Sequence, residues 1–287
     1  RTIVATQNES SRQVWKITGG DSENLLQLTS GPQKHFDSLA WVGDEFVVFD
    51  EDESSSHNNY NIWRMRADGT EKQQLTFGLG NNTAPAISPD GNYIVFVSNR
   101  TGKSELWRMD TNGGKLVQLT NTDYTPSLPQ FTPDGKSILF LASIAGRFPL
   151  WKVSASGGAS TQILDQDIYD WAISPDGNRV AFSTFDKQAQ KVRTYIYSLV
   201  TSQTEQVLDI SPETWLRWSN DGNSIYFNTR DDGVKNIWQF SLNSNRQAPI
   251  TKFTDQQVFR FYWSPKNNTL ACIRQVGTFD AVILRAE

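Results

Sequence analysis

The stretches 88-SPDG-91, 132-TPDG-135, 174-SPDG-177 and 219-SNDG-222 recur every 42 to 45 residues, and a degenerate copy, 264-SPKN-267, follows 45 residues later. Proline presets φ, aspartate accepts a hydrogen bond from the backbone two residues on, and glycine adopts a positive φ. Each stretch therefore predicts a tight turn. Self-similarity at this period indicates one supersecondary unit that is repeated and stacked.

The clearest copy of the unit surrounds the first of these turns. Ala84–Ile87 predicts a short strand before the turn, and Tyr93–Ser98 after it is a β-branched and aromatic run typical of a buried strand. Leu106–Met109 alternates apolar and polar residues, and Leu116–Thr120 follows the hairpin signal 112-NGG-114. Four antiparallel strands joined by tight turns predict one blade of a β-propeller.

The remaining copies set the expected number of blades. Second strands are expected at Ile3–Ala5, Phe46–Phe49, Tyr93–Ser98, Ile138–Phe140, Val180–Phe182, Ile225–Phe227 and Leu270–Cys272, and third strands carry Trp15, Trp63, Trp107, Trp151, Tyr197, Trp238 and Val282. Both strands thus occur seven times, whereas inner and outer strands occur six times. The pattern predicts an all-β propeller with seven blades. A six-bladed ring, which would leave roughly the first 17 residues surplus, is the alternative.

We expect residues 1–287 to form a single propeller domain. Because 1-RTIVAT-6 reads as the middle of a repeat, we also expect the chain to be a piece of a longer, multidomain protein. The recurring tryptophans at the third-strand position are expected to pack between blades. The lone Cys272 predicts a buried thiol and no disulfide, which fits either cytoplasm or periplasm.

Composition argues against several classes of function. The chain has 27 Lys and Arg against 31 Asp and Glu, a net charge of −4, so no basic stripe favours nucleic acid. No apolar run approaches the length that spans a membrane. The sequence lacks the G-x-S-x-G elbow of a serine hydrolase, and its two histidines, His35 and His57, lie in loop sequence. We therefore expect no catalysis by this segment, no cofactor and no metal.

The acidic run Asp50–Glu53 permits two interpretations. It could contribute to a calcium site, but it lacks the glycine-punctuated loop that wraps the ion. A solvated loop between second and third strands is the better account, since runs of like charge usually stay in water.

The connections that precede the inner strands are expected to ring one mouth of the central channel. They offer carboxylates and aromatic rings, a composition suited to a cationic or peptide-like ligand. The alternative is that the aromatic residues, Trp215 especially, wedge between blades. The candidate binding residues are His35, Asp37, Asn82, Asp123, Tyr124, Tyr169, Asp170, Glu213, Trp215 and Phe259.

The succession 88-SPDG-91, 93-YIVFVS-98, 105-ELWRMD-110 and 116-LVQLT-120 resembles the PD40 type of WD40-like repeat, which builds the propeller of the bacterial protein TolB. The segments 249-PITKFTDQQVFRFYWS-264 and 270-LACIRQVGTFDAVIL-284 are similar to the last blades of the C-terminal propellers of bacterial serine/threonine kinases and winged-helix transcriptional regulators. The resemblance to the PD40 repeat covers nearly the whole chain, and the second likeness lies in its C-terminal third.

The resemblance implies a non-catalytic interaction or sensing domain. Such a domain would bind a protein segment or small ligand at the channel mouth and follow a signalling effector domain. It also implies a place on the periplasmic side of a bacterial membrane protein, although a cytoplasmic place fits the residues too. Two alternatives are a TolB-like periplasmic adaptor and a propeller that gates a serine peptidase or hydrolase.

Overall fold

The computed structural model describes residues 2–18, 24–30, 36–52, 59–78, 80–210, 212–213, 215–231, 233–255, 257–265 and 269–285, without the side chains of 2–10, 231 and 276–285. Within these residues every regular element is a β-strand. No helix with the length and hydrophobicity needed to cross a membrane occurs in this described part.

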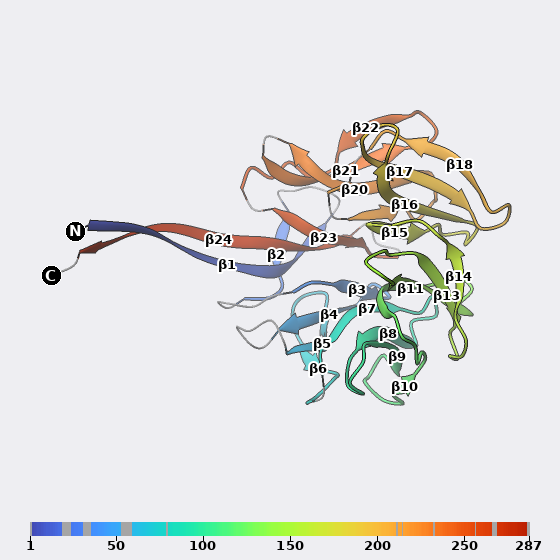
Figure 1. Cartoon of the computed structure of the whole chain (residues 1–287). Coiled ribbons are helices and arrows are strands. Elements are labelled where there is room, and N and C mark those ends of the chain that lie inside the picture. Colours follow the sequence, from blue (N-terminus) through green and yellow to red (C-terminus); the bar gives the residue numbers. More distant parts are fainter. Residues whose placement is uncertain are drawn as a thin grey trace.

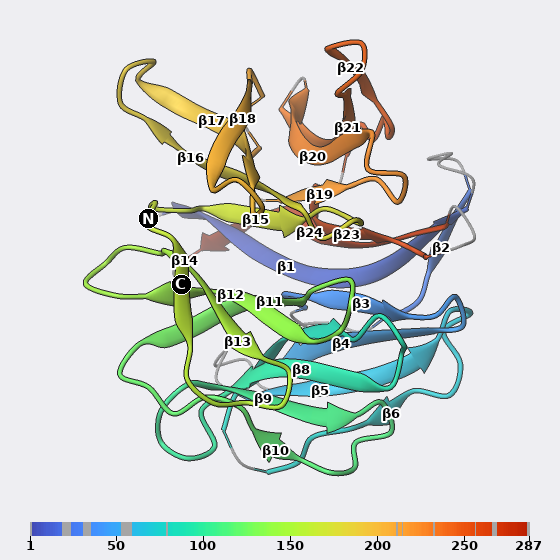
Figure 2. The ribbon, with the colours of Figure 1, turned by 90° about the vertical axis from the view of Figure 1, so that its right-hand side faces the viewer.

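Six four-stranded antiparallel sheets form the blades of a propeller. Outer strands such as β10, β18 and β22 lie at its periphery (Figure 2). Five blades are continuous in sequence, and their strands follow in order from inner to outer. Blade 1 contains β3 (Leu39–Val42), β4 (Phe46–Asp52), β5 (Tyr60–Arg66) and β6 (Gln73–Gln74); blade 2 contains β7 (Asn82–Ile87), β8 (Tyr93–Ser98), β9 (Glu105–Asp110) and β10 (Val117–Gln118); blade 3 contains β11 (Thr125–Phe131), β12 (Ser137–Ser143), β13 (Leu150–Ser154) and β14 (Thr161–Leu164). Blade 4 contains β15 (Asp170–Ile173), β16 (Arg179–Asp186), β17 (Lys191–Ser198) and β18 (Gln203–Leu208); blade 5 contains β19 (Leu216–Trp218), β20 (Ser224–Asp231), β21 (Val234–Ser241) and β22 (Arg246–Pro249).

Blade 6 joins the two ends of the chain. Its inner strands are β23 (Val258–Trp263) and β24 (Thr269–Arg285), and its outer strands are β1 (Thr2–Thr18) and β2 (Leu25–Gln27). β1 pairs with β24 in one unbroken register, from Thr2 opposite Arg285 to Thr18 opposite Thr269. The far halves of these two strands project from the propeller as a two-stranded ribbon (Figure 1).

The expectation of seven blades is therefore wrong, and the propeller has six. The expected second strand at Ile3–Ala5 and third strand at Trp15 are two parts of the continuous strand β1. The expected strands at Leu270–Cys272 and Val282 are likewise two parts of β24. The first 17 residues are not wholly surplus either, because the near half of β1 supplies the third strand of blade 6, whereas its far half lies in the projecting ribbon (Figure 1).

The repeated turns between inner and second strands form as expected. In the first copy, Asp90 Oδ1 accepts hydrogen bonds from Ser88 Oγ at 2.5 Å and from the N–H of Asn92 at 3.1 Å. Gly91 takes a φ of +75°. These bonds lower the pKa of Asp90, the side-chain bond from Ser88 contributing most. The turn is thus fixed by its own side chains.

The Leu-Thr sequences that follow outer strands have a defined role. Thr120 Oγ1 accepts a hydrogen bond from the N–H of Leu106 at 2.9 Å and donates one to Glu105 at 2.5 Å. It thereby continues the ladder between third and outer strands where the backbone pairing ends. The hydroxyls of Thr29, Thr76 and Thr251 make the same pair of bonds in three other blades.

The cores lie between neighbouring blades, as predicted for the recurring tryptophans. Trp151 of blade 3, for example, packs on a cluster that contains Val95 and Leu106 of blade 2 and Phe140 of blade 3. Cys272 is fully buried in another such cluster, and burial raises the pKa of its thiol to about 12. The ring is therefore held together by apolar contacts between sheets.

Candidate functional site

An arc of charged side chains and one aromatic ring links three blades at the predicted mouth. Arg12 of β1 forms an ion pair with Asp37, and its guanidinium carbon lies 4.5 Å from the ring centre of Phe259. Lys235 lies 5.2 Å from the centre of the same ring and 3.3 Å from a carboxylate oxygen of Glu213. Arg230 also pairs with Glu213, at 3.1 Å. We call these six residues the mouth arc.

The mouth arc is accessible to a ligand except at Lys235, which is 6% exposed. The side chains of Asp37 and Arg230 are 42% and 49% exposed, and those of Arg12 and Glu213 about a third exposed. Three of the predicted binding residues, Asp37, Glu213 and Phe259, thus come together here. Sequence reasoning missed the cations that join them.

Trp215, two residues after Glu213, is the centre of a stack. The guanidinium carbons of Arg217 and Arg260 lie 3.4 Å and 3.8 Å from its ring centre. Its indole N–H donates to the carbonyl of Phe261 at 3.1 Å. Because Trp215 is only 1% exposed and packs in a cluster shared by blades 5 and 6, the interpretation of this residue as a wedge between blades is confirmed.

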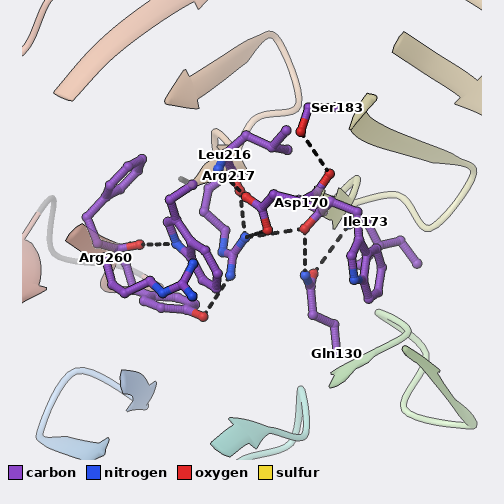
Figure 3. A network of polar contacts seen from close by, with 12 residues as sticks. Gln130, Asp170, Ile173, Ser183, Leu216, Arg217 and Arg260 are labelled. Carbon is purple, nitrogen blue, oxygen red and sulfur yellow. Dashed lines mark hydrogen bonds and ion pairs between the residues drawn. The ribbon is translucent and has the colours of Figure 1, made fainter. Parts of the chain in front are cut away.

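Asp170 is joined to this stack inside the channel (Figure 3). One carboxylate oxygen accepts a hydrogen bond from the N–H of Leu216 at 2.5 Å, and the other lies 3.9 Å from Arg217. Arg217 also donates to the hydroxyl of Tyr262 at 2.7 Å. Burial raises the pKa of Asp170 to about 6, against the attraction of Arg217 and Arg260. Asp170 therefore links blades 4 and 5 from a buried position.

Asp50 plays a similar linking role between blades 1 and 2. Its carboxylate accepts hydrogen bonds from the N–H groups of Asp37, Ser38 and Ala84 at 2.7 to 2.9 Å. Burial, and then the charge of Asp37, raise its pKa to about 7. Asn228 occupies the equivalent position in blade 5, where its amide donates to the carbonyls of Val258 and Phe259.

The interpretation of the acidic run as a solvated loop is therefore wrong for its first three residues. Asp50, Glu51 and Asp52 belong to β4 and are at most 2% exposed. The next residue, Glu53, lies outside the described residues, as does His57.

The other predicted binding residues do not join the mouth arc. Asn82 is fully buried and bonds to Ser98 and Arg100. Asp123 is almost fully exposed and pairs with Lys103 at 2.8 Å. The ring of Tyr124 packs 5.0 Å from that of Trp151, whereas Tyr169 is 52% exposed. His35 lies outside the described residues.

The central channel contains a cavity of about 280 Å³ next to this stack. It is lined from five blades, and its aromatic wall consists of Trp41, Phe131, Trp218, Tyr262 and Trp263. Arg217 and Tyr262 belong both to this wall and to the stack. Arg217 and Arg260 could have been found from the sequence. Each is a charged residue among the aromatic residues of an inner strand, and such a residue must face the channel or a neighbouring blade.

No group of three or more His, Cys, Asp or Glu side chains in the described part of the chain is arranged to hold a metal ion. The polar groups of the site are arginine, lysine, carboxylate and amide side chains that pair with one another. Such a site can bind a ligand by exchanging ion pairs and by stacking.

With this geometry in view, comparison with known families decides the classification. The model of the Tricorn protease N-terminal beta propeller domain matches residues 55–271. The chain belongs to this family. The match begins between β4 and β5, covers the two outer strands of blade 1, blades 2 to 5 and β23, and ends within the first three residues of β24.

Solved structures share the fold of this family member. Putative TolB from Agrobacterium tumefaciens has a TM-score of 0.72 and 16% identity over 94% of this chain and 99% of its own. TolB from Acinetobacter baumannii has a TM-score of 0.62 and 16% identity over 92% of this chain, which spans 63% of that protein. Oligogalacturonate lyase from Vibrio parahaemolyticus has a TM-score of 0.61 and 13% identity, with 89% of this chain and 81% of its own covered. No curated protein matches the chain.

Proposed function

We propose that the chain is a non-catalytic binding domain that receives a protein segment or small ligand at the mouth arc. The observation that supports this proposal is the continuous row of paired charges around Phe259, partly exposed and contributed by three blades. A rigid scaffold that presents such side chains at the mouth of a channel is suited to recognition.

The charges favour a segment that carries carboxylates. In the described mouth arc, Arg12, Arg230 and Lys235 stand against two carboxylates, those of Asp37 and Glu213. A cationic ligand would have to compete with these built-in cations. An acidic side chain can instead add to the existing pairs, and an aromatic neighbour can stack on the channel wall.

A displayed library of random peptides tests the proposal. We expect selection on the purified chain to enrich acidic peptides, and the double variant R12A/R230A to weaken their binding by about tenfold or more in fluorescence anisotropy. The matched control is K103A, which removes the exposed partner of Asp123 elsewhere on the rim and should leave binding unchanged. Enrichment of basic peptides, or equal binding by R12A/R230A, would contradict the proposal.

The wider setting proposed for the domain rests on the C-terminal resemblance quoted above. We place it after a kinase or winged-helix effector, on the outer side of a bacterial membrane. Fractionation and protease protection of the full-length protein test that placement. Protection of the propeller inside spheroplasts would contradict it.

A propeller that gates a peptidase is the second candidate, and the family match favours it because the matched domain is named for the Tricorn protease. Labelling of the full-length protein by an active-site serine probe would support this candidate. Labelling by the serine probe does not depend on the mouth arc. Its outcome therefore tests the peptidase candidate separately from the proposed binding of a peptide at the mouth arc.

A further inference from the structure

Two neighbouring pairs of blades are joined at their turn side by the same arrangement. Arg64 of blade 1 stacks on Phe46, 4.9 Å from its ring centre, and donates to the carbonyl of Thr111 in blade 2 at 3.0 Å. Arg108 of blade 2 stacks on Tyr93 at 4.5 Å and donates to the carbonyl of Ala155 in blade 3 at 2.7 Å. In both blades, the arginine that bonds to the next blade is thus stacked on an aromatic ring of its own blade.

The interface between blades 3 and 4 has no aromatic ring at this position. Ser137 begins the second strand of blade 3, where Phe46 and Tyr93 begin theirs, and Lys152 stands at the position of the two arginines. Neither the Ser137 hydroxyl nor the Lys152 ammonium makes a hydrogen bond or ion pair within the described part of the chain. A cleft of about 550 Å³ remains between blades 3 and 4, with both residues in its lining.

The apolar part of this cleft suits an aromatic group, and the rest of the lining is polar and includes the carboxylates of Asp134 and Asp176. Leu139 and Ile163 of blade 3 face Tyr197 and Leu199 of blade 4 across it. Val200, also in the lining, is 73% exposed and extends the apolar surface beyond the room that one ring needs. Ile163 lies on β14, the outer strand of its sheet, so the backbone of an approaching segment can run along that edge.

We propose that this cleft binds an aromatic side chain presented by a segment of a partner protein. The ring takes the place that Phe46 and Tyr93 hold in the two preceding blades, with its face toward the ammonium of Lys152. The residues next to it contact Val200 and β14. This surface is separate from the mouth arc, so the inference does not rest on the function proposed above.

The test uses the whole chain and two tripeptides, acetyl-Ala-Phe-Ala-amide and its leucine counterpart. Their affinities are measured by chemical-shift titration in NMR. We expect the phenylalanine peptide to shift the amides of blades 3 and 4 and to bind about tenfold more tightly than the leucine peptide. S137Y supplies a ring from the chain itself and should abolish binding, whereas the matched control S137A should preserve it.

K152M keeps the apolar stem of the lysine but removes its charge. It should weaken the phenylalanine peptide several-fold without changing the leucine peptide, and it decides the question even if S137Y does not fold. Equal affinity of the two peptides, binding unaffected by S137Y, or no binding at millimolar concentration would overturn the proposal. Free phenol binding as tightly as the phenylalanine peptide would overturn the assignment to a protein segment.

Discussion

The carboxylate of Asp50 accepts a hydrogen bond from the N–H of Ala84, 2.9 Å away in the next blade. Ala84 has a φ of +54° and lies where the register of β7 against β8 shifts. A left-handed conformation costs a non-glycine residue about 1 kcal/mol, so this bond offsets the strain of the bulge. The buried acid thus helps to shape the inner strand of its neighbour.

Asp50 predicts a specific dependence of stability on pH. Because burial raises its pKa from 3.8 to about 7, the folded protein retains a proton that the unfolded chain has already released. The stability associated with this group is full below pH 4 and is lost as the pH rises to 7. The shift corresponds to about 4 kcal/mol as an order of magnitude.

The variant D50N removes this titration. The difference in unfolding free energy, wild type minus D50N, should therefore decrease as the pH is raised from 4 to 8. Urea denaturation at a series of pH values measures it. A difference that stays constant over this range would show that Asp50 does not titrate in the folded protein as inferred.

Loss of the single hydroxyl group of Thr120 is expected to lower the unfolding free energy strongly. T120V leaves the N–H of Leu106 and the buried Glu105 without their shared partner, so we expect a loss of about 1 to 3 kcal/mol in unfolding free energy. The control T120S retains the hydroxyl and should stay within about 0.5 kcal/mol of the wild type. Similar losses for both variants would assign the effect to the methyl group instead.

Gly157 and Gly146 separate backbone strain from contact between blades. Both have positive φ, +88° and +78°. A Cβ at Gly157 would lie 3.1 Å from the carbonyl oxygen of Leu119 in the previous blade, whereas a Cβ at Gly146 would meet nothing within 4 Å. We expect G157A to lower the melting temperature clearly more than G146A, and calorimetry measures both. Equal losses in melting temperature would mean that the strain of a positive φ accounts for both effects and that contact between blades adds nothing.

Arg217 is expected to limit the cost of the buried Asp170. In R217M the carboxylate loses a cation 3.9 Å away, so its pKa should rise further above its ordinary range and the fold should lose about 3 kcal/mol near neutral pH. Adding D170N to R217M should recover part of this loss in urea denaturation. The control R230M removes an exposed pair and should cost at most about 1 kcal/mol. No recovery in the double variant would show that Arg217 acts only through Trp215 and Tyr262.

Much of the fold could be predicted because its local signals coincide with local hydrogen bonds. The Ser-Pro-Asp-Gly turns bond to themselves, as Ser88 and Asp90 show, and Thr120 bonds within its own blade. The blade count failed at the ends of the chain. Asn8 to Ser11 resembles a turn in composition, but a strand ladder is built by the backbone, and pairing with β24 keeps this stretch extended.

The site was harder to predict because its contacts join distant parts of the sequence. Arg12 and Phe259 meet only when the ring closes, and Lys235 reaches Glu213 across a blade. The acidic residues 50–52 were expected in water because a sequence does not show which backbone N–H groups donate hydrogen bonds to a buried carboxylate. Three of the ten candidate residues nevertheless reach the mouth arc, since the connections before inner strands do face one end of the channel.

The pairing of β1 with β24 also sets the order in which the ring can be assembled. During synthesis, the earliest strand must wait for one of the last, while blades 1 to 5 form as an open array with unsatisfied edges. Ring closure is therefore a late event of very high contact order. A product truncated before β24 would leave β1 paired only with the short strand β2, and it would be a target for chaperones and proteases even with five complete blades.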